Sequence, residues 1–440
     1  MKKLIMLLCF SCFSSIAFAS GCATPDNATA SDTEIKLEGY FDFQSGYRNQ
    51  GKLSGTSKNI TDNKKNLTFY TEAAFMATVK QELNDITAGA KIVLLPTTKP
   101  KLSASYNGSH IFIETEYGKV ELGSPHDAAS NMSVTAGAIA VPLGGCGWGK
   151  FAVLDDNNMK YKGLKPDFDT SGAGSSQIGS FSNSFDDISG KTEASRKVSY
   201  YTPEMQGFQF GISYIPDSAN TGGNRSLKNL DDKGLSKLSV GITKVELPGI
   251  NGGKGDQVII NQNVKDAISV GISYKYAIID DVAVKVAVTG EYAKPASKII
   301  VLDPNSKVLS RDKLSNLTSY SLGAVLTYGN VSCAASYGSL GKSLTSKTYH
   351  KVGRNTQYYK GAVAYGQGPM KTSVSYFKSL KYKNTVDTVS LGTQYLVTPG
   401  LLPYAEISYF QAKGRPVYSV EAPKTKTRGA VALIGARLKF

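Results

Sequence analysis

The feature that most constrains this chain is an alternation of apolar and polar side chains with a period of two. In residues 35–43 the polar positions are Lys36, Glu38, Tyr40 and Asp42, and all but one of the positions between them are apolar. Successive side chains of a β-strand point to opposite faces, so this pattern predicts strands with one apolar face and one hydrophilic face. No segment of comparable length has the three-and-four spacing of an amphipathic helix.

The pattern recurs from end to end and predicts about 16 strands. The segments are 35–43, 67–79, 86–95, 111–115, 119–123, 197–203, 208–216, 268–276, 282–292, 317–328, 331–337, 357–365, 370–377, 388–395, 402–410 and 429–440. An even number places both ends of a closed barrel on one side of the membrane. We therefore assign the extra candidates, 238–247 and 258–260, to a hairpin inside the long loop 217–265.

The connections between these segments alternate in length. Tight links lie at 83–85, 117–118, 204–207, 279–281, 329–330, 367–368 and 398–400, and each is followed by a long polar connection. Short turns at one rim and long loops at the other are typical of transmembrane β-barrels, with the turns periplasmic and the loops extracellular. The predicted fold class is all-β, a transmembrane antiparallel β-barrel.

The first residues predict export. Lys2 and Lys3 precede an uncharged apolar stretch, and Ala17-Phe18-Ala19 has the form that signal peptidase cleaves. We expect a signal peptide at 1–19, a short N-terminal segment at 20–34 and the barrel at 35–440. An uncleaved anchor and lipidation at Cys22 are the alternatives.

Composition excludes several classes of site. Removal of the signal takes away Cys9 and Cys12 and leaves an odd, scattered set in which only Cys22 and Cys146 form a conceivable pair. The three histidines lack metal-ligand spacing, so we expect no metal and no cofactor. The chain holds 50 Lys and Arg against 35 Asp and Glu, but the basic residues are spread singly, which argues against nucleic-acid binding.

Two short patterns resemble catalytic motifs without their context. Residues 144–150 follow a phosphate-loop pattern, yet Phe151 stands where Ser or Thr must bind magnesium. His126 and Asp127 beside Ser124 and Ser130 contain hydrolytic residue types, but a catalytic triad is defined by spatial geometry, not by adjacency. We expect no enzymatic activity.

The last strand carries a specific local signal. Apolar and small residues alternate from Ala430 to Phe440, and the segment ends on the aromatic residue. Phe440 resembles the signal by which the barrel-assembly machinery recognises its outer-membrane clients.

Two motifs resemble the Gram-negative general porin family, particularly its alphaproteobacterial members. Residues 117–125, YGKVELGSP, resemble the strand that leads into the family's constriction loop, and residues 197–214 resemble the hairpin that leaves it. The resemblance implies a 16-stranded barrel, a homotrimer and a third extracellular loop, here 124–195, that folds inward and narrows the channel.

The site of such a protein is a polar surface around water, and its selectivity follows from the width and charge of the narrowest ring. The alternation nominates as pore-lining residues Lys36, Glu38, Asp42, Glu72, Lys91, Lys119, Glu121, Lys197, Lys285, Lys360, Lys371, Arg437 and Lys439. The inward loop offers Asp127, Asp155, Asp156, Asp167, Asp169, Asp186 and Asp187. The resemblance implies a basic wall that faces an acidic loop.

The sequence thus predicts a bacterial outer-membrane porin, a water-filled channel for passive diffusion of small hydrophilic solutes and ions. The excess of Lys and Arg predicts a mild anion preference, and the alternative is that lysines of the surface loops account for the excess. Its partners would be outer-membrane lipid, the barrel-assembly machinery and two further copies of itself. The alternatives are a surface-exposed structural or adhesin barrel with a plugged lumen, and a secreted β-sandwich or lipoprotein binding module.

Overall fold

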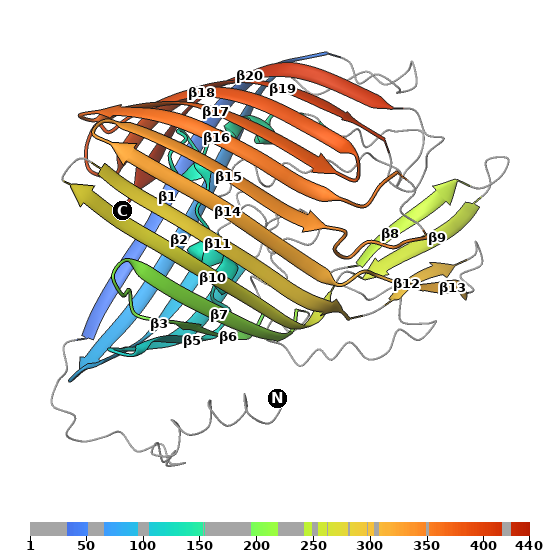
Figure 1. Cartoon of the computed structure of the whole chain (residues 1–440). Helices are drawn as coiled ribbons and strands as arrows, with labels where there is room; N and C mark the ends of the chain where they lie inside the picture. The colour runs from blue at the N-terminus through green and yellow to red at the C-terminus, as the bar shows by residue number, and fades with distance from the viewer. Residues whose placement is uncertain are drawn as a thin grey trace, which may run out of the picture.

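The chain forms a closed antiparallel barrel of sixteen strands (Figure 1). The computed structural model describes residues 33–51, 66–95, 105–152, 154, 195–218, 242–248, 254–261, 263–279, 282–296, 298–302, 308–348, 352–415 and 424–440. In barrel order the strands are β1 (Thr33–Gln50), β2 (Leu67–Leu83), β3 (Ile86–Leu95), β4 (Ser105–Thr115), β5 (Gly118–Gly123), β6 (Lys197–Tyr201), β7 (Phe208–Asp217), β10 (Val264–Ile279), β11 (Val282–Pro295), β14 (Leu317–Tyr328), β15 (Val331–Gly341), β16 (Thr356–Gln367), β17 (Met370–Lys381), β18 (Asn384–Tyr395), β19 (Leu401–Gly414) and β20 (Thr425–Lys439).

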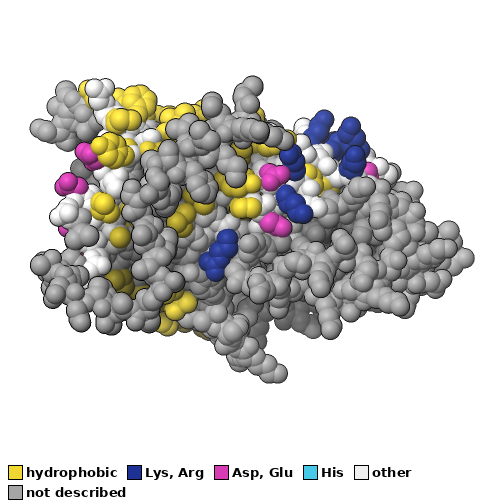
Figure 2. All heavy atoms as spheres, turned by 90° about the horizontal axis from the view of Figure 1, so that it is seen from below, with side chains coloured by type: hydrophobic (Ala, Val, Ile, Leu, Met, Phe, Trp, Pro, Cys, Tyr) yellow, Lys and Arg dark blue, Asp and Glu magenta, His cyan; other side chains and the backbone are white. Residues whose placement is uncertain are grey.

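The two faces of the barrel keep the alternation that the sequence predicts. The outward positions of β1, for example Ile35, Leu37 and Phe41, are more than half exposed, whereas the inward Asp42 and Gln44 are buried. Cross-strand pairing preserves this parity around the ring, so a residue on the inner face always lies opposite another on the inner face. Figure 2 shows hydrophobic side chains over the wall, and Lys and Arg side chains toward the end at which β8 and β13 lie in Figure 1.

Each of the sixteen predicted strands corresponds to one barrel strand, and the predictions for β3 and β14 have the observed bounds. The predicted extra hairpin is also confirmed, as β8 (Ile242–Pro248) paired with β9 (Lys254–Asn261). The loop after β11 holds two further strands that the sequence did not reveal, β12 (Lys298–Leu302) and β13 (Val308–Lys313). Together they form a separate four-stranded sheet in the order β13-β12-β9-β8.

Short and long connections alternate with one exception. The turns that end β2, β14 and β16 are tight, as predicted. At the opposite rim, however, β17 and β18 are joined by only two residues, Tyr382 and Lys383, both with positive φ. Two positive φ values make the mirror-image turn that matches the twist of a hairpin. Gly, Asn or Asp is the usual sign of that turn, so the sequence did not reveal it.

The ring closes where β1 pairs with β20. The backbone N–H of Phe440 donates to the carbonyl of Gly39, and the N–H of Gly39 donates to the carbonyl of Phe440. The Phe440 ring lies so close to Gly39 that a Cβ there would approach it to 2.7 Å. Across the same seam the carboxylate of the fully buried Asp42 forms an ion pair with Arg437 at 2.5 Å and accepts a hydrogen bond from the hydroxyl of Tyr404.

Helices are few. Within the part of the chain that the structure describes, they are α2 (Ala128–Met132) and the 3-10 turns η1 (Ala136–Ala138) and η2 (Gly147–Lys150), all between β5 and β6. None of the helices in these described ranges is long and apolar enough to cross a bilayer.

We expect the Asp42–Arg437 ion pair to stabilise the seam between β1 and β20. Arg437→Met leaves a fully buried carboxylate without its cation, and we expect the free energy of unfolding to fall by about 3 kcal/mol. The measurement is the temperature at which samples that have not been boiled convert from the folded to the unfolded form on gels, and this temperature should fall. Asp42→Asn combined with Arg437→Met removes the uncompensated charge and should recover most of the loss. A midpoint unchanged by Arg437→Met alone would contradict this role.

Candidate functional site

The inner face of the barrel carries a belt of short hydroxyl side chains. Its buried members are Ser199, Ser213, Ser269, Ser321, Ser336, Ser373, Ser375, Ser390 and Ser408. Short side chains leave room inside a closed sheet for another layer of chain. The described part of the connection between β5 and β6, residues 124–152, occupies that room, and we call it the inner segment.

The inner segment is attached to the belt through its backbone. The N–H groups of Ala128, Ala129 and Val141 donate to the hydroxyls of Ser213, Ser269 and Ser373 at 2.7–2.8 Å. Further along, the hydroxyl of Ser390 donates to the carbonyl of Gly145 at 3.1 Å. These four serines belong to β7, β10, β17 and β18, so the inner segment follows the inner wall around much of the barrel.

Two glycines of the wall let the backbone of the inner segment approach. A Cβ at Gly323 on β14 would lie 1.6 Å from the carbonyl oxygen of Val134, and a Cβ at Gly392 on β18 would lie 1.9 Å from that of Val141. No side chain fits in such a space, so glycine at these positions follows from the close approach of two backbones.

The predicted loop residue Asp127 lies against the wall. It is fully buried, and its Oδ1 accepts hydrogen bonds from the N–H of Ser130 at 2.9 Å and from the hydroxyl of Ser269 at 2.8 Å. Asp127 therefore caps α2 and attaches this short helix to β10.

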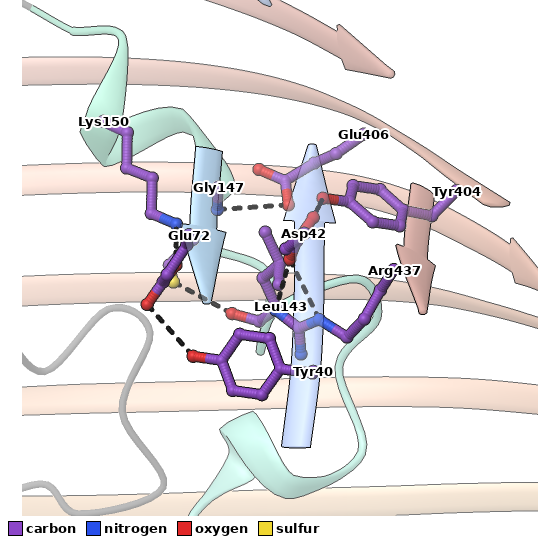
Figure 3. Close-up of polar contacts among 10 residues, drawn as sticks. Tyr40, Asp42, Glu72, Leu143, Gly147, Lys150, Tyr404, Glu406 and Arg437 are labelled. Carbon is purple, nitrogen blue, oxygen red and sulfur yellow. Dashed lines mark hydrogen bonds and ion pairs between the residues drawn. The ribbon is translucent and has the colours of Figure 1, made fainter. Parts of the chain in front are cut away.

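A buried carboxylate that the sequence analysis did not single out holds the other end of the inner segment. Glu406 on β19 accepts hydrogen bonds from the N–H groups of Gly147 and Trp148, at 3.3 and 3.2 Å, where η2 begins. Figure 3 shows the hydrogen bond from Gly147. The Trp148 ring stacks on Phe410, with 5.2 Å between centroids. A signal was present, because Glu406 occupies a polar position of the alternating segment 402–410, but no motif marked it.

Beside this anchor, a wall acid pairs with a base of the inner segment. The Nζ of Lys150 lies 2.5 Å from Glu72 of β2 and 4.4 Å from the centre of the Tyr70 ring. The hydroxyl of Tyr40 donates to the other oxygen of Glu72 at 3.2 Å, and the residues point toward one another in Figure 3. The resemblance implied the opposite arrangement, a basic wall and an acidic loop. At this contact the signs are reversed.

Other predicted residues form pairs on the same wall. Lys36 lies 2.7 Å from Glu38, and Lys119 lies 2.7 Å from Glu121. The Nζ of the buried Lys197 donates to the carbonyl of Pro125 at 2.5 Å, which fixes the start of the inner segment. Four of the predicted charged residues therefore neutralise one another in two ion pairs. A fifth, Lys197, donates to a backbone carbonyl instead.

On the opposite wall, formed by β11 to β17, the predicted lysines have no acidic partner of this kind in the described ranges. Lys285 of β11 and Lys371 of β17 are on the inner face, each close to the start of its strand, and neither makes an ion pair within the described ranges. Lys360 of β16 donates to the carbonyl of Gly144 at 2.6 Å. Lys91 and Lys439 also lie at inner-face positions.

Several predictions fall outside the described residues. They are the acids Asp155, Asp156, Asp167, Asp169, Asp186 and Asp187, and the possible disulfide partner Cys22. Cys146 is a free thiol whose Sγ donates to the carbonyl of Leu143, and burial raises its pKa to about 11. Within the described ranges no group of His, Cys, Asp and Glu could hold a metal ion.

Comparisons with known proteins agree with this architecture. A family profile described as Gram-negative porin matches residues 11–415. Proteins of Rickettsia felis and Rickettsia bellii, both described as uncharacterized, are each 55% identical over the whole of both chains.

Two solved structures share the fold. An anion-selective porin from Comamonas acidovorans gives a TM-score of 0.53 at 13% identity, with 93% of this chain and 100% of that chain covered. OmpF of Salmonella typhi, solved in complex with daunomycin, gives 0.52 at 12% identity, with 92% and 97% covered.

The close approach at Gly323 generates a prediction. Gly323→Ala places a Cβ against the Val134 carbonyl, so we expect the inner segment to shift away from the wall. Trp148 is the only tryptophan of the chain and is fully buried, so the shift should move its fluorescence to the red and raise its quenching by acrylamide. Gly290→Ala is the matched control, because a Cβ there makes an ordinary contact of 3.5 Å. Identical spectra for the two variants would disprove the constraint.

Proposed function

The chain belongs to the Gram-negative porin family, and from that premise we propose that it is a passive diffusion channel for small hydrophilic solutes and ions. Family and fold together indicate a channel of the outer membrane. The observation that carries the finer proposal is the inner face. A ring of hydrophilic side chains inside an apolar outer surface is the arrangement that holds water within a bilayer.

The narrowest part of this channel would lie beside the inner segment, as part of a constriction loop that spans 124–195. Support comes from the anchors at both ends, Lys197 to Pro125 and Glu406 to η2, which hold the segment against the wall rather than above the rim. The pore-lining residues at this level would include Glu72 and Lys150. Asp127 would act by fixing the segment, since it is buried in the wall contact.

We further propose an anion preference that depends on the difference between the two walls. Around β1 to β5 the charges are largely paired within the protein, and a paired charge contributes little to the field in the channel. Lys285 and Lys371 supply positive charge on the other wall without an ionic partner in the described ranges. Unpaired cations at a water-filled surface attract anions.

The assembly and export of the protein follow the same family pattern. We propose a cleaved signal peptide at 1–19, recognition of the last strand and Phe440 by the barrel-assembly machinery, and a homotrimer. The hydrogen-bonded position of Phe440 on Gly39 is compatible with a strand that closes the barrel last.

The channel proposal predicts stepwise conductance. Purified protein in planar bilayers should open in discrete steps, because each insertion adds one water-filled path. Liposomes that contain the protein should also swell in small sugars. An ordered barrel that neither conducts nor admits sugars would contradict the proposal and favour the plugged structural or adhesin barrel.

The selectivity proposal predicts the effect of two substitutions. Lys285→Gln combined with Lys371→Gln should shift the reversal potential in a salt gradient toward cation preference and lower the anion-to-cation permeability ratio about twofold. The control is Lys294→Gln, because Lys294 lies at an outward position of β11 and pairs with Asp266 at 3.7 Å. A wild-type channel that prefers cations would refute the proposal, and so would an unchanged ratio in the double variant.

A further inference from the structure

Three connections at the rim of the long loops pack into one structure. They are the end of the connection from β11 to β14, the connection from β15 to β16, and the two-residue turn between β17 and β18. We call their described residues, together with the adjoining strand ends, the basic platform. These residues are 312–316, 341–348, 352–356 and 381–385.

Hydrogen bonds brace the first two connections against each other. The guanidinium of Arg354 donates to the hydroxyl and to the carbonyl of Thr345, at 2.9 and 3.3 Å, and also to the hydroxyl of Ser315. The carboxylate of Asp312 accepts a hydrogen bond from the hydroxyl of Ser346 at 2.5 Å. The N–H of Ser315 in turn donates to the carbonyl of Thr345 at 3.0 Å.

The third connection joins the same structure. The N–H of Tyr382 donates to the carbonyl of Asn355 at 2.9 Å. The side chain of Lys383 lies against Gly353, where a Cβ would come within 2.9 Å of the Lys383 Cγ. The backbone that carries the side chains of the platform is therefore fixed by contacts among all three connections.

The platform has a large excess of positive charge. Asp312 is the one acid among its described residues, and its carboxylate already accepts from Ser346. The cations are Lys313, Lys342, Lys347, Arg354, Lys381 and Lys383. Four of these lysines are exposed and form no ion pair within the described ranges, namely Lys313, Lys342, Lys347 and Lys383. Unpaired cations on one braced surface repel one another and attract anions.

The place of these lysines in the chain indicates where a ligand comes from. Lys342 and Lys347 lie between β15 and β16, and Lys383 lies in the turn after β17, so all three are beyond the ends of the barrel strands. Lys313 ends β13, which belongs to the separate sheet. The ligand of the platform is therefore a molecule of the surrounding medium.

The residue types of the platform indicate the chemistry of that ligand. Its large apolar side chains, Leu314, Leu344, Val352 and Tyr382, are all buried. The described residues of the platform thus expose no aromatic ring for stacking a nucleic-acid base and no apolar anchor for a protein. Lysine ammonium groups are strongly hydrated point charges, which suit a hydrated polymer that repeats a strong anion along its length.

We propose that the basic platform binds a sulfated polysaccharide outside the cell. Sulfate groups bind the four exposed lysines, while Arg354 holds the connections that carry them. The proposal rests on the proposed orientation, with the long loops outside. It goes beyond the channel function, which requires no ligand at this rim.

The test uses heparin as the sulfated probe. Folded full-length protein in detergent should bind immobilised heparin, and the affinity should fall about tenfold between about 50 and 200 mM salt, because binding releases counterions. Hyaluronan, which has carboxylates but no sulfate, should bind about tenfold more weakly because its charge density is lower. Diphosphoryl lipid A or a double-stranded oligonucleotide that binds as tightly as heparin would overturn the assignment to a polysaccharide.

Paired substitutions locate the site. Lys342→Gln combined with Lys347→Gln should weaken heparin binding about tenfold, since it removes two of the four exposed cations. The matched control is Lys80→Gln combined with Lys275→Gln, because these lysines lie near the short-turn ends of β2 and β10. The control should bind heparin as the wild type does. Equal losses in the two double variants would mean that net charge alone attracts heparin, and would overturn the proposal.

The two functions can fail independently. Single-channel conductance in neutral-lipid bilayers at high salt reports the channel alone, and Lys342→Gln with Lys347→Gln should leave it unchanged. A protein that conducts but does not bind heparin would disprove only the platform. One that binds heparin without conducting would disprove only the channel.

Discussion

The backbone hydrogen bonds between β1 and β20 are the constraint on which this structure depends. Hydrocarbon offers no partner for an unpaired N–H or C=O, so a sheet that spans a membrane must close on itself. Closure in register also forces every strand to keep the same parity. A slip of one residue at any pair would turn an apolar row inward and a charged row toward lipid. The Asp42–Arg437 pair and the Phe440–Gly39 hydrogen bonds hold the seam at one register.

Closure also decides what the interior can contain. The belt of serines and the glycines at 323 and 392 keep the wall thin where the inner segment lies against it. Because the N–H groups of Ala128, Ala129 and Val141 donate to serine hydroxyls, and those of Gly147 and Trp148 donate to Glu406, these backbone groups are satisfied without a sheet or a long helix. Side chains of the wall thus accept the backbone hydrogen bonds that carbonyl groups of a helix or sheet accept elsewhere.

The outer and inner faces use charge differently. Inside, the pairs around β1 to β5 neutralise one another while Lys285 and Lys371 have no ionic partner in the described ranges, so position along the ring matters more than the total excess of lysine. Outside, four cations, Lys378, Lys413, Lys426 and Arg428, lie on the loop side of the outward row that contains Tyr376 and Tyr409. Net charge read from composition cannot separate these two populations.

The sequence by itself determined the strands, their even number, the face that each side chain takes and the family, because a period of two is a local property that lipid on one side and water on the other make unambiguous. It did not reveal β12 and β13, whose pairing depends on strands from another loop, or the two-residue turn at Tyr382 and Lys383. It named Glu72 and Asp127 but assigned them no partners, and it did not single out Glu406. Only the tertiary structure decided which charges are neutralised, which one caps a helix and which remain available to a solute, since those contacts join residues up to hundreds of positions apart.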